Sequence, residues 1–200
     1  MSVPSSVVGV LLAAGTASRF GDDQKLLAEL DGEPLVRHAA RPLLDANLDG
    51  VVAVLGDERE RVAAALPPDI ETVHNPAYAD GQATTVARGA RAAADRGADA
   101  AVLALGDMPC VDAGTVAALV DAFQRTGSDI VVPTNEGRRG NPVLFGAAHF
   151  DALQAVGGDR GGRALFDSYP VERVAVEDPG IHLDIDTEDD MRTLAERCAE

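Results

Sequence analysis

The chain has 200 residues, 46% of them hydrophobic and 25% charged, which is typical of a folded protein that builds its core without disulfides or structural metal. It carries 33 Asp and Glu against 17 Lys and Arg, a formal net charge of −16. Such a surface repels nucleic acid and anionic lipid, so we expect neither nucleic acid nor a membrane as a partner. Scarce lysine beside abundant carboxylates is typical of halophilic proteins, whose charges concentrated salt screens.

Segments that direct a chain to a membrane or bind zinc are not evident in the sequence. No apolar run reaches the roughly 20 residues of a membrane helix, and MSVPSS lacks the basic start and long apolar stretch of a signal peptide. Cys110 and Cys198 have neither CxxC spacing nor a paired histidine. We therefore expect a cytoplasmic protein with two reduced thiols.

Short apolar runs alternate with segments of helical apolar spacing along the first two thirds of the chain. The runs that predict strands are Val7–Ala14, Val51–Leu55, Ile70–His74, Ala100–Leu105 and Ile130–Pro133. The segments that predict helices are Pro34–Ala46, Glu58–Leu66, Thr84–Arg96 and Thr115–Arg125. This alternation predicts an α/β fold in three layers, with a mostly parallel sheet between helices and ligands at the carboxyl ends of its strands.

The alternation of predicted strands and helices ends after residue 133, where short strands are flanked by polar glycine-rich loops. The sequence predicts strands at PVLF (142–145) and at Val171–Val176, separated by the loop GGDRGGR (157–163). A final helix is predicted after Thr187, which forms an acidic capping box with Asp190. We expect one domain over residues 1–200, with a nucleotide-binding half at about 1–110 and an acceptor-side half at about 111–200.

The loop after the first predicted strand, LLAAGTASRFGDDQKLL (11–27), has the residue types of a phosphate-binding loop. Ala13, Ala14 and Gly15 allow a ligand to approach main-chain N–H groups, and the cations Arg19 and Lys25 can bind phosphate oxygens. From composition alone, a surface loop with incidental charges is an equal alternative. The motifs GxxxxGK[ST] and GxGxxG are absent, which argues against a P-loop NTPase and a dinucleotide dehydrogenase.

The segment LLAAGTASRFGDDQKLLAELDGEPL (11–35) closely resembles LAAGxSxRxGxxKLLxxxxGxPL, the signature of nucleotidyltransferases related to molybdenum cofactor cytidylyltransferase. The resemblance implies a Rossmann-like, nucleotide-diphospho-sugar transferase-like fold with this loop around a nucleoside triphosphate. It implies that Leu12, Ala13, Ala14 and Gly15 line the nucleotide and that Arg19 and Lys25 bind its phosphates. Relatives that use GTP tend to read LAGG in place of LAAG, so the resemblance favours CTP.

Asp107 follows an apolar strand in LALGDMPCVD (103–112), at the edge of the sheet where the first loop also lies. A carboxylate beside a phosphate loop suits Mg²⁺, which is bound by one or two carboxylates together with substrate phosphates. The alternative is a helix N-cap, which is favoured for an isolated aspartate. GDMP stands at this place in the relatives, which implies that Asp107 is the principal metal ligand.

Two more carboxylates, Asp184 and Asp186, alternate along HLDIDTEDD (182–190) and therefore point the same way in an extended segment. The alternative is that the acidic residues complement the positive end of the last helix. The relatives read DIDTPEDL here. That match implies Asp186 as the second metal ligand and Asp184 as an outer supporter, with Glu188 replacing a proline.

The segment HNPAYADGQATTVARG (74–89) resembles the NPxxxxGMxTSL segment of the same family. The resemblance implies contacts to base and ribose from Asn75, Gly81, Thr84 and Thr85, with a plain helix cap as the alternative. Gln82 stands where methionine is usual, which leaves the packing against the base open.

The acceptor side is implied by GNPVLF (140–145) and GGDRGGRALF (157–166), which resemble GHPVLF and a GDxGAR stretch. Asn141, in place of histidine, and the arginines Arg160 and Arg163 are the candidate residues there. The alternative for the arginines is that they are merely solvated.

Together these motifs predict a Mg²⁺-dependent nucleotidyltransferase that joins CMP from CTP to the phosphate of molybdenum-bound molybdopterin and releases pyrophosphate. The histidines lack a serine or cysteine partner, so covalent catalysis is not expected. A phosphomonoester acceptor is ionised near neutrality because its second pKa is about 6, so positioning and charge neutralisation suffice. The alternatives are transfer to a sugar phosphate or phospholactate, glycosyl transfer, and a non-catalytic carrier of nucleotide or cofactor. A molybdoenzyme or its chaperone is the expected protein partner.

Overall fold

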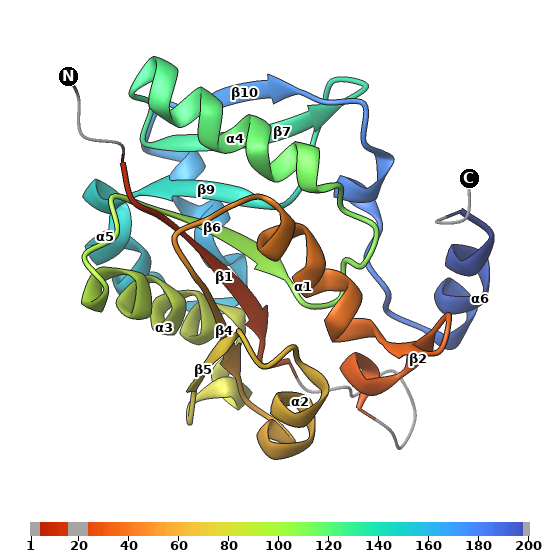
Figure 1. Ribbon diagram of the computed structural model, residues 1–200. Coiled ribbons are helices and arrows are strands. Elements are labelled where there is room, and N and C mark those ends of the chain that lie inside the picture. Colours follow the sequence, from red (N-terminus) through yellow and green to blue (C-terminus); the bar gives the residue numbers. More distant parts are fainter. Residues whose placement is uncertain (1–4, 16–23, 198–200) are drawn as a thin grey trace.

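The computed structural model describes residues 5–15 and 24–197, apart from the side chains of 158–160, 188, 193 and 195–197. Its centre is a mixed sheet of eight strands in the order β10-β7-β9-β6-β1-β4-β5, with β8 paired to β7 (Figure 1). Strands β8 and β9 run antiparallel to their neighbours, and all other pairs are parallel. The strands are β1 (Val7–Ala13), β4 (Val51–Leu55), β5 (Glu71–His74), β6 (Ala100–Leu105), β7 (Ile130–Asn135), β8 (Arg138–Arg139), β9 (Val143–Gly146) and β10 (Glu172–Ala175).

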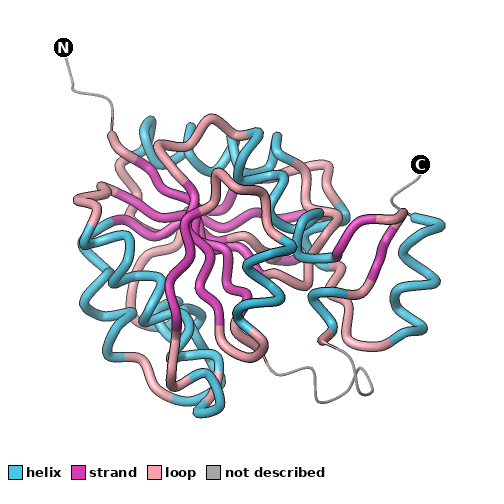
Figure 2. Tube along the Cα trace, turned by 60° about the horizontal axis from the view of Figure 1, so that its bottom comes forward, coloured by secondary structure: helices cyan, strands magenta, loops and turns pink. Residues whose placement is uncertain are grey.

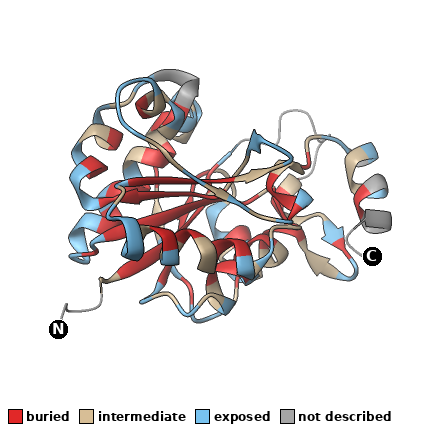
Figure 3. Cartoon of the chain, turned by 90° about the horizontal axis from the view of Figure 1, so that it is seen from above, coloured by how far each residue is buried: buried red, intermediate tan, exposed pale blue. Residues whose placement is uncertain are grey.

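Helices cover both faces of this sheet, and the central strands are therefore buried on both sides (Figure 3). Successive residues of β1 point to opposite faces of the sheet, since Leu11 packs in one apolar cluster and Val10 in the other. One face carries α1 (Leu35–Asp45), α2 (Arg59–Ala65) and α4 (Ala113–Thr126). The other carries α3 (Gln82–Asp95), α5 (Phe150–Ala155) and the 3-10 segment η4 (Gly158–Asp167).

A third, smaller apolar cluster lies beside the main body and includes Leu30, Leu35, Ile185 and Leu194. It joins the hairpin of β2 (Glu29–Leu30) and β3 (Glu33–Pro34) to α6 (Glu188–Arg197). Figure 2 shows the hairpin and α6 side by side at one end of the molecule. The cluster thereby fixes the start of the last helix against residues that follow the first loop.

The predicted three-layer α/β fold is confirmed, and each predicted strand and helix is present within a few residues of its expected bounds. Strands from both halves of the chain share one sheet. The β2–β3 hairpin, β8 and α5 were not predicted, and the predicted loop 157–163 lies largely within the 3-10 segment η4. The expectation of reduced thiols is wrong for Cys110, which is disulfide-bonded, and Cys198 lies outside the described residues. No helix in the described segments is long and apolar enough to cross a bilayer.

Candidate functional site

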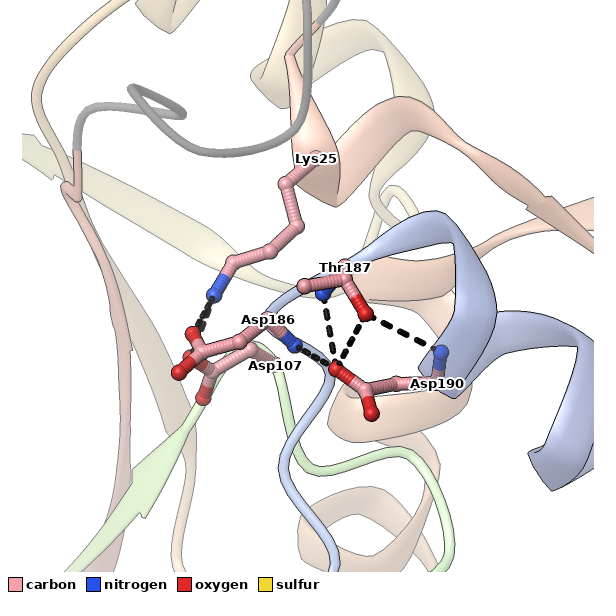
Figure 4. Close-up of polar contacts among 5 residues, drawn as sticks. All are labelled: Lys25, Asp107, Asp186, Thr187 and Asp190. Carbon is pink, nitrogen blue, oxygen red and sulfur yellow. Dashed lines mark hydrogen bonds and ion pairs between the residues drawn. The ribbon is translucent and has the colours of Figure 1, made fainter.

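Three charged side chains from distant parts of the chain meet beside the carboxyl end of β6 (Figure 4). Lys25 begins η1 (Lys25–Leu27), Asp107 comes two residues after β6, and Asp186 stands just before α6. The Lys25 Nζ donates to Asp107 Oδ2 at 2.8 Å and to Asp186 Oδ1 at 3.2 Å. The fold therefore brings together three of the four residues that the motifs single out for phosphate and metal; the fourth, Arg19, lies outside the described residues.

Hydrogen bonds of the surrounding main chain hold Asp186 in place. The N–H of Ile185 donates to the Asp107 carbonyl at 2.9 Å, which ties the two aspartate segments directly to each other. The carboxylate of Asp190 accepts from the N–H of Asp186 at 3.1 Å and from the N–H and hydroxyl of Thr187, both at 2.8 Å. These bonds, led by the Thr187 hydroxyl, lower the pKa of Asp190. The acidic capping box predicted at the start of α6 is confirmed.

The electrostatics of the site centre on Lys25, the only lysine of the chain. Its side chain is 17% exposed, against 26% for Asp107 and 48% for Asp186. Burial alone lowers the pKa of Lys25, but the charges and hydrogen bonds of Asp107 and then Asp186 outweigh burial and raise this pKa above 10.5. The ammonium therefore stays charged at neutral pH and offsets part of the negative charge of the two carboxylates.

The donor chemistry of Asp107 and Asp186 fits a hard divalent cation. Their oxygens converge on one positive charge, and Mg²⁺ is held in many sites by one or two carboxylates, with phosphates and water completing its shell. Within residues 5–15 and 24–197, no group of three or more His, Cys, Asp or Glu side chains could hold a metal. A cation here would take its remaining ligands from substrate and solvent.

A cavity of about 250 Å³ opens beside Asp107 and spans the two halves of the chain. Its apolar walls come from β1, α3, β6 and β9 and are formed by Leu12, Val86, Leu103, Leu105, Val143 and Phe145. Polar side chains of Gln82, Asn141, Arg163 and Asp184 complete the lining. The cavity is therefore lined both by Leu12 of the predicted nucleotide loop and by Asn141 and Arg163 of the predicted acceptor side. It lies next to the charged cluster of Lys25, Asp107 and Asp186.

Asn75, Thr84 and Thr85, for which the sequence predicts nucleotide contacts, bond to one another in the structure. Asn75 is 3% exposed, and its Nδ2 donates to Thr84 Oγ1 at 2.9 Å and to Thr85 Oγ1 at 3.1 Å. Its Oδ1 accepts from the N–H of Ala77 at 3.1 Å. This network anchors the start of α3 to the loop before it, and a direct nucleotide contact stays a prediction.

The other residues for which nucleotide contacts are predicted fall into three groups. Ala13 and Ala14 are 2% and 1% exposed, so their methyl groups pack in the core, whereas Gly15 is exposed. Gly81 has φ 111° immediately before α3, a conformation that other residues rarely adopt. Arg19 lies outside the described residues.

On the acceptor side, the side chain of Arg160 is likewise outside the part of the chain that the structure describes. Sequence reasoning did not single out five apolar residues of the cavity wall, which are Val86, Leu103, Leu105, Val143 and Phe145. An apolar residue that faces a cavity has the same sequence signal as one that faces the core, so only the tertiary structure distinguishes them.

Comparison with known proteins places the chain in a family. A family model described as "MobA-like NTP transferase domain" matches residues 9–174, and the chain belongs to that family. It is 28% identical over the full length of both chains to a probable molybdenum cofactor guanylyltransferase of Mycobacterium avium. It is also 31% identical to the nicotine blue oxidoreductase of Paenarthrobacter nicotinovorans, over 94% of this chain and 96% of the relative.

The fold is also similar to that of a solved relative, Rv0371c of Mycobacterium tuberculosis. The two chains are 29% identical with a TM-score of 0.82, covering 97% of this chain and 100% of the other. A crystal structure of Rv0371c in complex with manganese has a TM-score of 0.76 and 28% identity, over 96% of this chain and 99% of that one. A divalent cation thus accompanies the fold in that relative.

Proposed function

We propose that this protein transfers CMP from CTP to the terminal phosphate of a molybdenum-bound pterin and releases pyrophosphate. The observation that carries the proposal is the convergence of Lys25, Asp107 and Asp186 beside a cavity that reaches the acceptor-side residues. Membership of the MobA-like family supports nucleotidyl transfer as the reaction class. A molybdoenzyme or its chaperone is the proposed receiver of the product.

The chemistry requires charge neutralisation more than acid–base catalysis. An ionised phosphate oxygen of the acceptor forms a bond to the α-phosphorus of CTP, and the bond from that phosphorus to the bridging oxygen of pyrophosphate breaks. Lys25 and Arg19 bind the polyphosphate, while Asp107 and Asp186 would hold Mg²⁺. A bound Mg²⁺ supplies positive charge beside the reacting phosphates. Asn141 and Arg163 orient the acceptor in the cavity, so that its phosphate lies in line with the leaving group.

A second candidate is transfer of GMP from GTP, which the printed name of the Mycobacterium avium relative favours. The Ala14 methyl is buried, so any effect of this residue on the choice of base acts through the course of the main chain and not by direct contact. Choice of base is therefore tested separately from choice of acceptor.

The test measures pyrophosphate release and product mass for each of the four nucleoside triphosphates with Mg²⁺. The acceptor panel contains molybdenum-bound pterin, a sugar phosphate and phospholactate. We expect turnover with CTP and the pterin. Turnover only with GTP supports the second candidate. Turnover only with another acceptor identifies that compound, and not the pterin, as the substrate. A nucleoside diphosphate as product indicates glycosyl transfer, and no product in any combination indicates a carrier.

Matched variants distinguish a loss of transfer activity from a loss of folding. Asp107→Ala removes the carboxylate next to Lys25, and we expect it to abolish transfer while the protein stays folded. Asp112→Ala, five residues further on, removes only the side chain that caps α4 by accepting from the N–H of Gly114 at 2.9 Å. It is expected to retain transfer. Equal activity of the Asp107 variant and the wild type contradicts the proposed role.

A further inference from the structure

The carboxylate of Asp178, which no motif singled out, is buried between two segments of the site. It is 7% exposed and lies just before η5 (Pro179–His182). Its Oδ2 accepts from the N–H of Asp112 at 2.9 Å and from the hydroxyl of Thr115 at 2.7 Å. Its Oδ1 accepts from the N–H of Gly180 at 2.8 Å. One side chain thus joins the beginning of α4 to the segment 178–186.

These are the two segments that carry the proposed metal ligands. Residues 107–112 lead from Asp107 into α4, and residues 178–186 lead to Asp186. The segments are joined at one end by Asp178 and at the other by the hydrogen bond from the N–H of Ile185 to the Asp107 carbonyl, at 2.9 Å. Of the three donors to Asp178, the N–H groups of Asp112 and Gly180 belong to these two segments, and the Thr115 hydroxyl belongs to the first turn of α4.

Between the two ties, the main chains are in direct contact. A Cβ built on Gly180 would lie 1.9 Å from the carbonyl oxygen of Cys110, which leaves no room for a side chain. The close contact between Gly180 and the Cys110 carbonyl oxygen is therefore possible only at the present separation of the two segments. Burying a carboxylate is unfavourable unless donors satisfy it, and here the donors come from both sides of the apposition.

We propose that Asp178 is a positioning residue, which holds the segments 107–112 and 178–186 together so that the carboxylates of Asp107 and Asp186 converge on one cation. The inference rests on the proposed function for the identity of that cation. The convergence itself does not depend on that identity, because Lys25 bridges the two carboxylates.

Lys25 provides a direct readout, since it is the single lysine of the chain and selective ¹⁵N and ¹³C labelling of lysine therefore yields one side-chain ¹⁵Nζ NMR signal. The variant Asp178→Asn keeps the shape of the side chain but turns an N–H donor toward the N–H and hydroxyl donors around it. Asp186→Asn supplies the reference signal of Lys25 without its second carboxylate. Asp112→Ala is the matched control, because it weakens the same turn yet keeps the backbone N–H that Asp178 binds.

We expect the Lys25 signal of Asp178→Asn to move from the wild-type position toward that of Asp186→Asn, and that of Asp112→Ala to stay in place. The second measurement is Mn²⁺ binding to the nucleotide-free full chain, followed by electron paramagnetic resonance. We expect Asp178→Asn to raise the Kd for Mn²⁺ about 10- to 100-fold, as is usual for loss of a group that orients metal ligands. Asp112→Ala is expected to bind Mn²⁺ like the wild type.

A folded Asp178→Asn variant with the wild-type Lys25 signal and wild-type Mn²⁺ affinity overturns the inference. If Asp178→Asn does not fold, Thr115→Val takes its place, because it removes one donor at nearly constant volume. A smaller displacement in the same direction then supports the inference, and an unmoved signal refutes it. If Asp107→Asn binds Mn²⁺ as the wild type does, the metal assignment of the proposed function fails, and the Lys25 signal alone decides the role of Asp178.

Discussion

Replacing Lys25 by methionine tests the electrostatic organisation of the site most directly. The variant keeps the length of the side chain but leaves Asp107 and Asp186 facing each other without the ammonium between them. We expect it to be less stable than the wild type and to bind Mg²⁺ more tightly in the absence of nucleotide, because the competing cation is gone. Millimolar Mg²⁺ is then expected to recover part of the lost stability.

The magnitude follows from the exposure of the three side chains. Breaking a fully buried ion pair costs about 3–5 kcal/mol, whereas exposed pairs contribute about 0–1 kcal/mol. Lys25 is 17% exposed, Asp107 26% and Asp186 48%, so solvent screens the second contact more than the first. We expect a loss of about 1–2 kcal/mol in the free energy of unfolding, most of it from the contact with Asp107.

The effect depends on pH in a direction that the raised pKa of Lys25 determines. A group whose pKa is higher in the folded than in the unfolded protein stabilises the fold fully below its unfolded pKa, which for lysine is about 10.4. That stabilisation is lost as the pH rises through the folded pKa, above 10.5. The difference in stability between wild type and Lys25→Met should therefore be constant from pH 7 to about 10 and shrink above it.

The assay is urea unfolding followed by circular dichroism over this pH range. Arg41→Met is the control, because its ion pair with Glu33, 2.6 Å long, is exposed on both sides. That variant should lose no more than about 1 kcal/mol. A Lys25→Met variant as stable as the wild type at pH 8, or a difference that persists unchanged above pH 11, would refute the electrostatic account.

Three further predictions concern the frame of the site and the charge of the whole chain. Gly180→Ala should cost about 1–3 kcal/mol or more in urea unfolding, because its Cβ would overlap the Cys110 carbonyl oxygen, and a neutral result contradicts the close contact. Asn75→Ala should cost about 1–3 kcal/mol by the same measurement, because it leaves the hydroxyls of Thr84 and Thr85 without their amide donor; an unchanged midpoint contradicts this. From the net charge of −16, the melting temperature should rise with KCl, and a fall between low and molar salt speaks against self-repulsion.

Sequence patterns were sufficient for the elements whose signals are local. A short apolar run such as Val51–Leu55 predicts a strand because both faces of a central strand are buried, and this depends on the run alone. The signal of the capping box is also local, because Thr187 and Asp190 bond to each other within four residues. The unpredicted β2–β3 hairpin also had a local signal, since Asp31 and Gly32 form the two-residue turn with φ 52° and 80°.

The tertiary structure alone decided which distant residues meet. Lys25 lies 82 residues from Asp107 and 161 from Asp186 along the chain, and their contact depends on strand order and on the small cluster that seats α6. The burial of Asn75 and the bonds of Asp178 depend in the same way on elements that no local pattern relates. A motif identifies residue types and their spacing, whereas the distance between side chains results from the packing of the entire sheet and its helices.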